Sequence, residues 1–200
     1  MSEQPLKDPH SQAGRKGRAA SGISLVELMM VVMILGLLSV VAVPVLSRYL
    51  RRARTVEATM NLRKLYDATV AYYATEHSDA YGTALPKQYP LPSGAGGSGW
   101  APTQGACCAQ AGQKCAPAVS ASLWLSPTWQ ALNFSMDDPF YYSFQTVGSG
   151  GSTIGDRYNL EASGDLNCDQ NYSLYRRVAV IESNYTVSAS SGIYATSAVE

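Results

Sequence analysis

The sequence has little charge and little histidine. Only 15% of its 200 residues are Asp, Glu, Lys or Arg, whereas soluble domains average about 25%. The 15 basic and 15 acidic residues cancel, which argues against a general nucleic-acid-binding protein, because such a domain is usually strongly basic. His10 and His77 are the only histidines, so there is little room for a histidine metal site or a Ser-His-Asp triad. The sequence also lacks G-x-S-x-G, H-E-x-x-H and P-loop motifs, which disfavours an enzyme.

One apolar run dominates the N-terminal quarter. Residues 23–46 carry a single charge, Glu27. A helix of this length would measure about 36 Å, enough to cross a hydrocarbon core of about 30 Å. Residues 1–22 are polar and contain four Lys or Arg. We therefore expect a leader peptide over 1–22, removed on maturation, and a transmembrane helix over 23–46.

Two ordinary explanations fit this run less well. The apolar region of a secretory signal peptide is about 7–15 residues long and ends in a small-residue cleavage site, which 23–46 does not. A plain anchor accounts for the length but not for Glu27, because an ionisable residue inside a span is costly and marks a function by default.

The residues around the start of the run resemble a known motif. Gly22-Ile23-Ser24-Leu25-Val26-Glu27 is similar to the prepilin cleavage motif of type IV pilins, with Ile23 where many of these proteins have Phe. The resemblance covers about 50 residues and implies that a prepilin peptidase cleaves between Gly22 and Ile23 and methylates the new amine of Ile23. It also implies the type IV pilin fold, an α+β fold in which a long N-terminal helix packs on a C-terminal antiparallel sheet.

The resemblance gives three residues of the span a role in assembly. Glu27 would pair with the Ile23 amine of a neighbouring subunit, which offsets the cost of burying either charge in lipid; the alternative is a pair within one chain. Proline and glycine weaken a helix, so the stretch between Gly36 and Pro44 would melt when the subunit joins a filament. An ordinary proline kink is the simpler alternative.

The helix is expected to continue beyond the span. Apolar residues recur at three- and four-residue spacing, and no Gly or Pro interrupts residues 45–79, so 47–79 is predicted to be the amphipathic half of one long helix. Arg48, Arg51, Arg52 and Arg54 begin this half. They form a solvated helix face or, in a filament, meet acidic residues of a neighbour.

The remaining residues, 80–200, are predicted to form a globular β head. Gly and Pro crowd the first part, so 80–130 is expected to be a connecting loop region. Residues 139–196 are expected to form an antiparallel sheet with strand-like runs; these are Phe140–Val147, Tyr158–Ala162, Tyr172–Ile181 and Tyr185–Tyr194. Segments of this head also resemble, more loosely, those of PilA-like pilins of deltaproteobacteria.

Four cysteines are predicted to form two disulfides, because the head would lie in an oxidising compartment. The preferred pairing is Cys108–Cys115 with Cys107–Cys168, and the alternative is Cys107–Cys115 with Cys108–Cys168. A four-cysteine zinc site is disfavoured because zinc ligands come as two separated pairs.

One loop offers a weak calcium candidate. Oxygen-bearing side chains alternate at Asp165, Asn167, Asp169 and Asn171, as in the first half of a calcium loop. Gln170 stands where an EF-hand needs glycine, so a polar turn is the simpler interpretation. No metal or other cofactor is therefore predicted.

The sequence predicts a structural subunit of a type IV pilus that polymerises through its apolar helix into an extracellular filament for adhesion or motility. The partners implied are other copies of the chain, the prepilin peptidase, an inner-membrane assembly platform, minor pilins and, before assembly, membrane lipid; no specific nucleic acid is expected. The alternatives are a type II secretion pseudopilin and a membrane-anchored adhesin that does not polymerise. The expected location is the inner membrane with a periplasmic head, then the cell surface.

Overall fold

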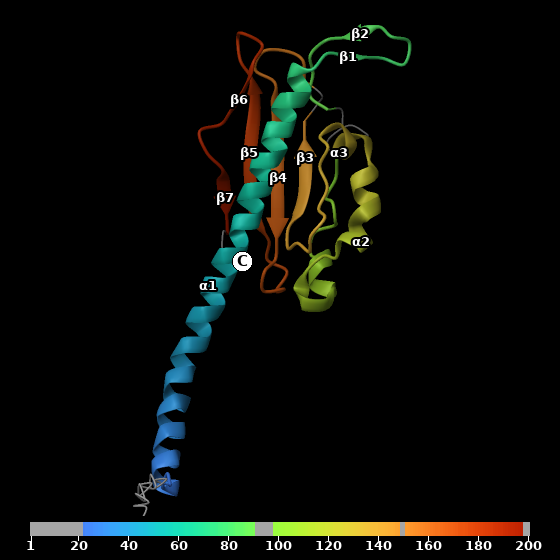
Figure 1. Cartoon of the computed structure of the whole chain (residues 1–200). Helices are drawn as coiled ribbons and strands as arrows, with labels where there is room; N and C mark the ends of the chain where they lie inside the picture. The colour runs from blue at the N-terminus through green and yellow to red at the C-terminus, as the bar shows by residue number, and fades with distance from the viewer. Residues whose placement is uncertain (1–21, 91–97, 149–150, 198–200) are drawn as a thin grey trace, which may run out of the picture. The chain divides into compact units, whose positions relative to one another are not determined.

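A computed structural model describes residues 22–90, 98–148 and 151–197 of the chain (Figure 1). The predicted leader, apart from Gly22, lies outside these residues. The chain divides into two units, Met1–Val43 and Pro44–Glu200, and each is described by itself. One helix, α1 (Leu25–Ala74), contributes to both.

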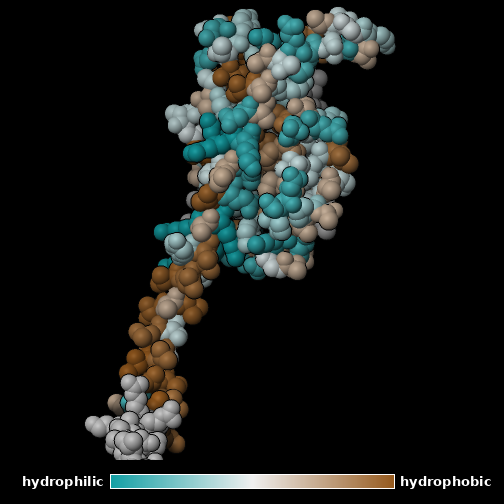
Figure 2. Space-filling view, viewed as in Figure 1, coloured by the Kyte–Doolittle hydropathy of each residue, from teal (hydrophilic) through white to brown (hydrophobic). Residues whose placement is uncertain are grey.

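In its described residues, the first unit consists of residues 22–24 and the N-terminal part of α1. These residues are all exposed, and Figure 2 shows apolar residues over the surface of this segment. α1 is long and apolar enough in this part to cross a membrane by length and composition. The helix predicted over residues 23–46 is therefore confirmed, with its first residue at Leu25.

The second unit combines the rest of α1 with an antiparallel sheet, as the predicted α+β layout requires. The strands are β3 (Ser143–Val147), β4 (Arg157–Gly164), β5 (Ser173–Ile181), β6 (Val187–Ala189) and β7 (Tyr194–Thr196). Their order is β3-β4-β5-β6, and β7 also pairs with β5. The single strand predicted over 185–194 is wrong. Ser190 Oγ donates to the Gly192 carbonyl, and the chain turns there into two short strands.

The core lies between α1 and the sheet, which α1 crosses in Figure 1. Because β4 alternates sides, every second residue points toward the helix. Fully or almost fully buried side chains include Leu62, Leu65 and Tyr73 of α1, Tyr158, Leu160 and Ala162 of β4, and Tyr175, Ala179 and Ile181 of β5. Burying each large apolar side chain contributes about 1.5–3 kcal/mol, so this interface fixes the sheet on the helix.

α1 ends earlier than the predicted residue 79. The side chain of His77 stacks on Tyr72 with ring centroids 4.0 Å apart, and its Nε2 lies 2.8 Å from the Tyr72 carbonyl oxygen. This contact turns the chain out of the helix. A short hairpin follows, formed by β1 (His77–Ser78) and β2 (Ala84–Leu85).

The region predicted as a connecting loop, 80–130, contains regular structure. Its short helices are η1 (Ala106–Ala109), η2 (Ala111–Gln113), α2 (Pro117–Ser120), η3 (Ala121–Leu125) and α3 (Pro127–Ala131). Pro117 and Pro127 begin α2 and α3, where the missing N–H costs no hydrogen bond. The prediction of a loop over this whole region is therefore wrong, because proline can begin a helix as well as break one.

An aromatic cluster holds these short helices beside β3. Trp124 meets Trp129 and Phe134 edge-on at centroid distances of 5.3 and 5.5 Å, and Phe134 contacts Phe144 of β3 at 5.5 Å. Edge-on aromatic pairs add about 0.5–1.5 kcal/mol each beyond the area that they bury. The short helices are thus part of the folded head.

Candidate functional site

The predicted cleavage position lies just before α1. Gly22 and Ile23 precede the helix in non-helical backbone, and Ile23 is exposed. A Cβ added at Gly22 would meet no atom within 4 Å, so packing within the described part of the chain does not require glycine there.

Glu27 occupies the third helical position of α1. Its backbone N–H donates to Ser24 Oγ at 3.1 Å, and the Leu28 N–H donates to the Ser24 carbonyl at 3.1 Å. Ser24 therefore caps the helix, and the Ser-x-x-Glu spacing is that of a capping box. The Glu27 side chain is exposed and has no ionic partner within the described residues. An acid at this end of a helix is favoured by the helix dipole, which is an explanation that sequence reasoning did not weigh.

Gly36 and Pro44 lie inside one continuous helix. A Cβ at Gly36 would meet nothing within 4 Å, so this glycine is free of packing demands from the described chain. After Pro44, Ser47 Oγ donates to the Pro44 carbonyl at 2.9 Å. The isolated chain is helical between the two residues, and melting on assembly stays a prediction.

The disulfides differ from the preferred pairing. Cys107 is bonded to Cys115, and Cys108 to Cys168, so the alternative pairing is the one that the structure contains. Cys107 and Cys108 are neighbours in the tight helix η1 and therefore point in different directions. Cys107 faces the core, where Cys115 is fully buried, and Cys108 faces the loop after β4 that carries Cys168.

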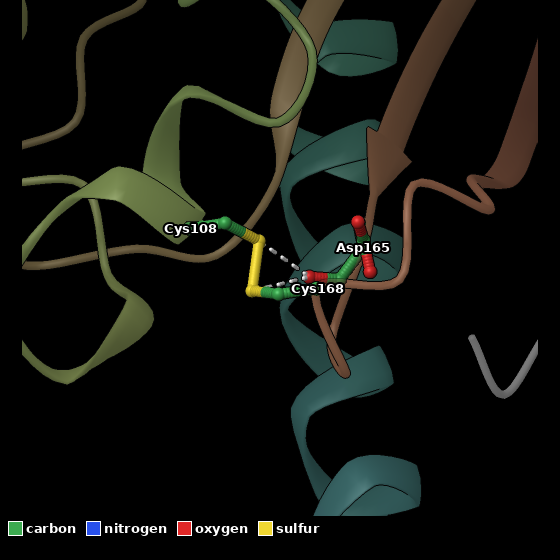
Figure 3. A group of neighbouring side chains, drawn as sticks. All are labelled: Cys108, Asp165 and Cys168. Atoms are coloured by element: carbon green, nitrogen blue, oxygen red, sulfur yellow. Dashed lines mark hydrogen bonds between the residues drawn. A yellow bond between two sulfur atoms is a disulfide. The ribbon is translucent and has the colours of Figure 1, made fainter.

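Cys108, Asp165 and Cys168 come together in space (Figure 3). Both sulfurs belong to the disulfide and cannot ligate a metal as thiolates. The Asp165 carbonyl oxygen lies 3.4 Å from Cys108 Sγ and 3.9 Å from Cys168 Sγ. This group is therefore a structural tie between η1 and the loop after β4.

In the calcium candidate, residues 165–171, the carboxylate oxygens accept hydrogen bonds from within the loop. The Asp165 carboxylate accepts backbone N–H groups from Asp169 and Gln170 at 3.2 and 2.9 Å. The Asp169 carboxylate accepts from Asn167 Nδ2 and from the Asn171 N–H, both at 2.8 Å. These hydrogen bonds lower the pKa of Asp169, the Asn171 N–H most of all. The donors are the loop's own, as expected for a polar turn.

Sequence reasoning missed Glu57 in α1. Its Oε1 accepts the backbone N–H groups of Tyr141 and Tyr142 at 2.9 and 3.2 Å. Desolvation by burial raises the pKa of Glu57, and the two N–H groups and the charge of Lys114 offset part of this. Its position in the sequence could have indicated this role. Glu57 stands one turn before the buried Asn61, on the face of the helix that is predicted to be covered.

Cationic side chains lie close to the contact between Glu57 and Tyr141. The guanidinium of Arg54 lies 4.5 Å from the centre of the Tyr141 ring, and Lys114 Nζ lies 5.1 Å from it. Arg51 is half-buried one turn before Arg54. The arginine cluster is visible in the sequence, but its contact with the head is not.

The fold and these sites define the class of protein coarsely. It is an α+β chain whose apolar N-terminal helix is long enough to span a membrane and whose head is tied by two disulfides. Comparison with protein-family models, with curated proteins and with solved structures found no match.

Proposed function

We propose that the chain is a type IV pilin, the subunit of an extracellular filament for adhesion or motility. The observation that carries the proposal is an apolar helix that is exposed from Leu25 to Leu46 and bears one carboxylate, Glu27. Water does not solvate such a surface favourably. Lipid covers it before assembly, and the same helices of neighbouring copies cover it in a filament.

Two glycines of this region support processing and packing by other molecules. Gly22 and Gly36 are glycines that the described chain does not need for its own packing. At Gly22, the absence of a side chain suits the cleft of a prepilin peptidase, which would cleave before Ile23 and methylate it. At Gly36, it allows a neighbouring helix to approach closely.

Glu27 supplies the specific contact in this proposal. The carboxylate of an incoming subunit pairs with the Ile23 amine that cleavage creates on its neighbour. Before cleavage, Ser24 and the helix dipole account for an acid at this position. After cleavage, burial in the filament interior requires a cationic partner.

The head favours a pilus over a secretion pseudopilus. Two disulfides suit a domain that ends outside the cell. The Asp165–Asn171 loop, whose carboxylates accept hydrogen bonds from its own N–H groups, resembles a polar turn more than the calcium site that would favour a pseudopilin. The proposed partners are other copies, the inner-membrane assembly platform and minor pilins.

The test is to shear the native cells, collect filaments and sequence the N-terminus of the chain found there. The proposal predicts a mature chain that begins at methylated Ile23 within filaments. A chain that keeps Met1 and remains in the membrane fraction would contradict it.

A further inference from the structure

A small concavity lies where α1 meets the loop after β4. It has a volume of about 210 Å³ and is lined by Ser47, Leu50, Arg51, Arg54, Leu166 and Asn167. All six residues belong to the unit Pro44–Glu200. Two guanidinium groups and two leucines thus share one hollow, which offers positive charge beside apolar surface.

The two arginines lack acidic partners. Among residues 22–90, 98–148 and 151–197, the one ion pair joins Arg176 to Glu161. The guanidinium of Arg54 lies over the Tyr141 ring. Nearby carboxylates are already engaged, because Glu57 and Asp165 accept backbone N–H groups. The hollow therefore contains two guanidinium groups that form no ion pair within the described residues.

The position of the arginines along α1 matches the headgroup layer of a bilayer. The apolar run ends at Leu46, and Arg51 follows about 8 Å further along the helix at 1.5 Å per residue. The headgroup region on each side of the hydrocarbon core is about 5–8 Å thick. Helical side chains also slant toward the helix N-terminus, so Arg51 and Arg54 reach back toward that layer.

The size of the hollow fits part of a lipid. Its volume corresponds to about seven water molecules at roughly 30 Å³ each, which accommodates a phosphodiester and the adjoining glycerol. Guanidinium groups bind phosphate through paired N–H donors. Leu50, which is exposed, provides apolar surface where the acyl chains begin.

We propose that Arg51 and Arg54 bind the phosphate of an anionic phospholipid in the leaflet on the head side of the membrane, before the subunit polymerises. The bound lipid holds the base of the head at the bilayer surface. This inference rests on the proposed membrane stage of the chain and names the lipid class that the arginines recognise.

The test uses the full chain in nanodiscs that contain phosphatidylcholine and phosphatidylglycerol, with native mass spectrometry to count the lipids that stay bound. Arg51→Gln is the first variant, because Arg51 makes no hydrogen bond or ion pair in the described structure and its loss should not unfold the head. Arg51→Gln/Arg54→Gln is the second. Arg63→Gln/Lys64→Gln is the matched control, since it removes the same charge from exposed positions further along α1.

We expect retained phosphatidylglycerol to fall about fivefold with Arg51→Gln and roughly 25-fold with the double variant, because each interfacial arginine contributes about a factor of five. The control should change by less than about twofold on the same basis. Millimolar inorganic phosphate should not displace the lipid, whose acyl chains also contact Leu50.

Equal losses in the double variant and the control would overturn the site, and so would equal retention of phosphatidylcholine. Displacement by inorganic phosphate would assign the hollow to free phosphate instead. If Arg51→Gln leaves lipid retention unchanged but weakens self-association, the arginines meet acidic residues of another copy and the lipid site is wrong. A chain that fails to enter the nanodiscs would refute the membrane stage itself, whereas one that enters without lipid preference refutes only this inference.

Discussion

The carboxylate of Glu57 and the backbone of Tyr141 are 84 positions apart in the sequence and share a 2.9 Å hydrogen bond. This bond, with its companion to Tyr142, joins the helix to the segment that leads into β3. It lies beside the cation–aromatic contact between Arg54 and Tyr141. The head is thus fixed on α1 by polar contacts as well as by the apolar core.

Two replacements of Glu57 should distinguish the contribution of its hydrogen bonds to stability from that of its charge. Glu57→Ala leaves two half-buried N–H groups without an acceptor and should cost about 1–3 kcal/mol of unfolding free energy. Glu57→Gln keeps an acceptor oxygen and should cost less at neutral pH. Chemical denaturation of the two variants checks this, and equal losses would show that the N–H groups do not depend on the acceptor.

The raised pKa of Glu57 fixes the sign of a pH effect. Because folding favours the protonated form, its contribution to stability is full below the ordinary value of 4.5 and is lost as pH rises through the folded-state pKa. Asp79, Asp156 and Asp169 have lowered pKa values and act in the opposite sense. The stability of the wild type minus that of Glu57→Gln should therefore fall from pH 4 to pH 7. A difference that rises would contradict the account.

The two disulfides should contribute different amounts to the free energy of unfolding. Cys108–Cys168 closes 60 residues and Cys107–Cys115 closes 8. Chain entropy then predicts losses of roughly 4 and 2.5 kcal/mol when each pair is changed to alanine. Denaturation of the two double variants measures the order, and mass spectrometry of non-reduced peptides checks the pairing. Peptides that link Cys108 to Cys115 would refute it.

Much of the fold could be predicted from the sequence, because the determining signals are local and periodic. An apolar run without breakers indicates a helix, and aromatic or β-branched runs between turn residues indicate strands. The end of α1 was harder to predict, since it depends on the contact between His77 and Tyr72. The split of the last strand depends on a turn at Ser190–Gly192 that composition alone does not reveal.

The less predictable features depend on contacts between distant segments. The pairing of Cys107 and Cys108 depends on which one faces the core, and adjacent positions in sequence do not reveal this. Glu57 resembles a surface acid until Tyr141 and Tyr142 are placed against it. The proposed processing motif could be identified from the sequence because all of its residues are contiguous.

Gly164, at the end of β4, should tolerate no side chain. A Cβ there would lie 2.6 Å from Cε1 of the fully buried Tyr142 ring. Gly164→Ala should therefore cost about 1–3 kcal/mol through overpacking. Gly192→Ala is the matched control, because a Cβ at Gly192 meets nothing within 4 Å. Thermal unfolding compares them, and equal melting temperatures would show that Tyr142 moves aside without cost.

Gly22 should be required for processing but not for folding. Gly22→Val should block leader removal, because the peptidase cleft excludes the branched side chain, while the head keeps its stability since nothing in the described chain contacts that position. Immunoblotting for the unprocessed chain measures the first effect and disulfide mapping the second. Normal processing of the valine variant would place the cut elsewhere.

The most direct test of polymerisation through the apolar helix is Glu27→Leu, with the exposed Glu76→Leu as the matched control. Removing a carboxylate from the span should favour insertion, by up to about 2.5–3.5 kcal/mol for a central position and less near the interface, and leader cleavage should persist. The measurement is the mass of sheared filaments per unit of processed, membrane-bound subunit. The account predicts a strong fall in filament mass for Glu27→Leu, because each incoming subunit would leave an Ile23 amine unpaired in lipid. It predicts no change in filament mass for Glu76→Leu. Assembly of the Glu27→Leu chain at the wild-type level would contradict it.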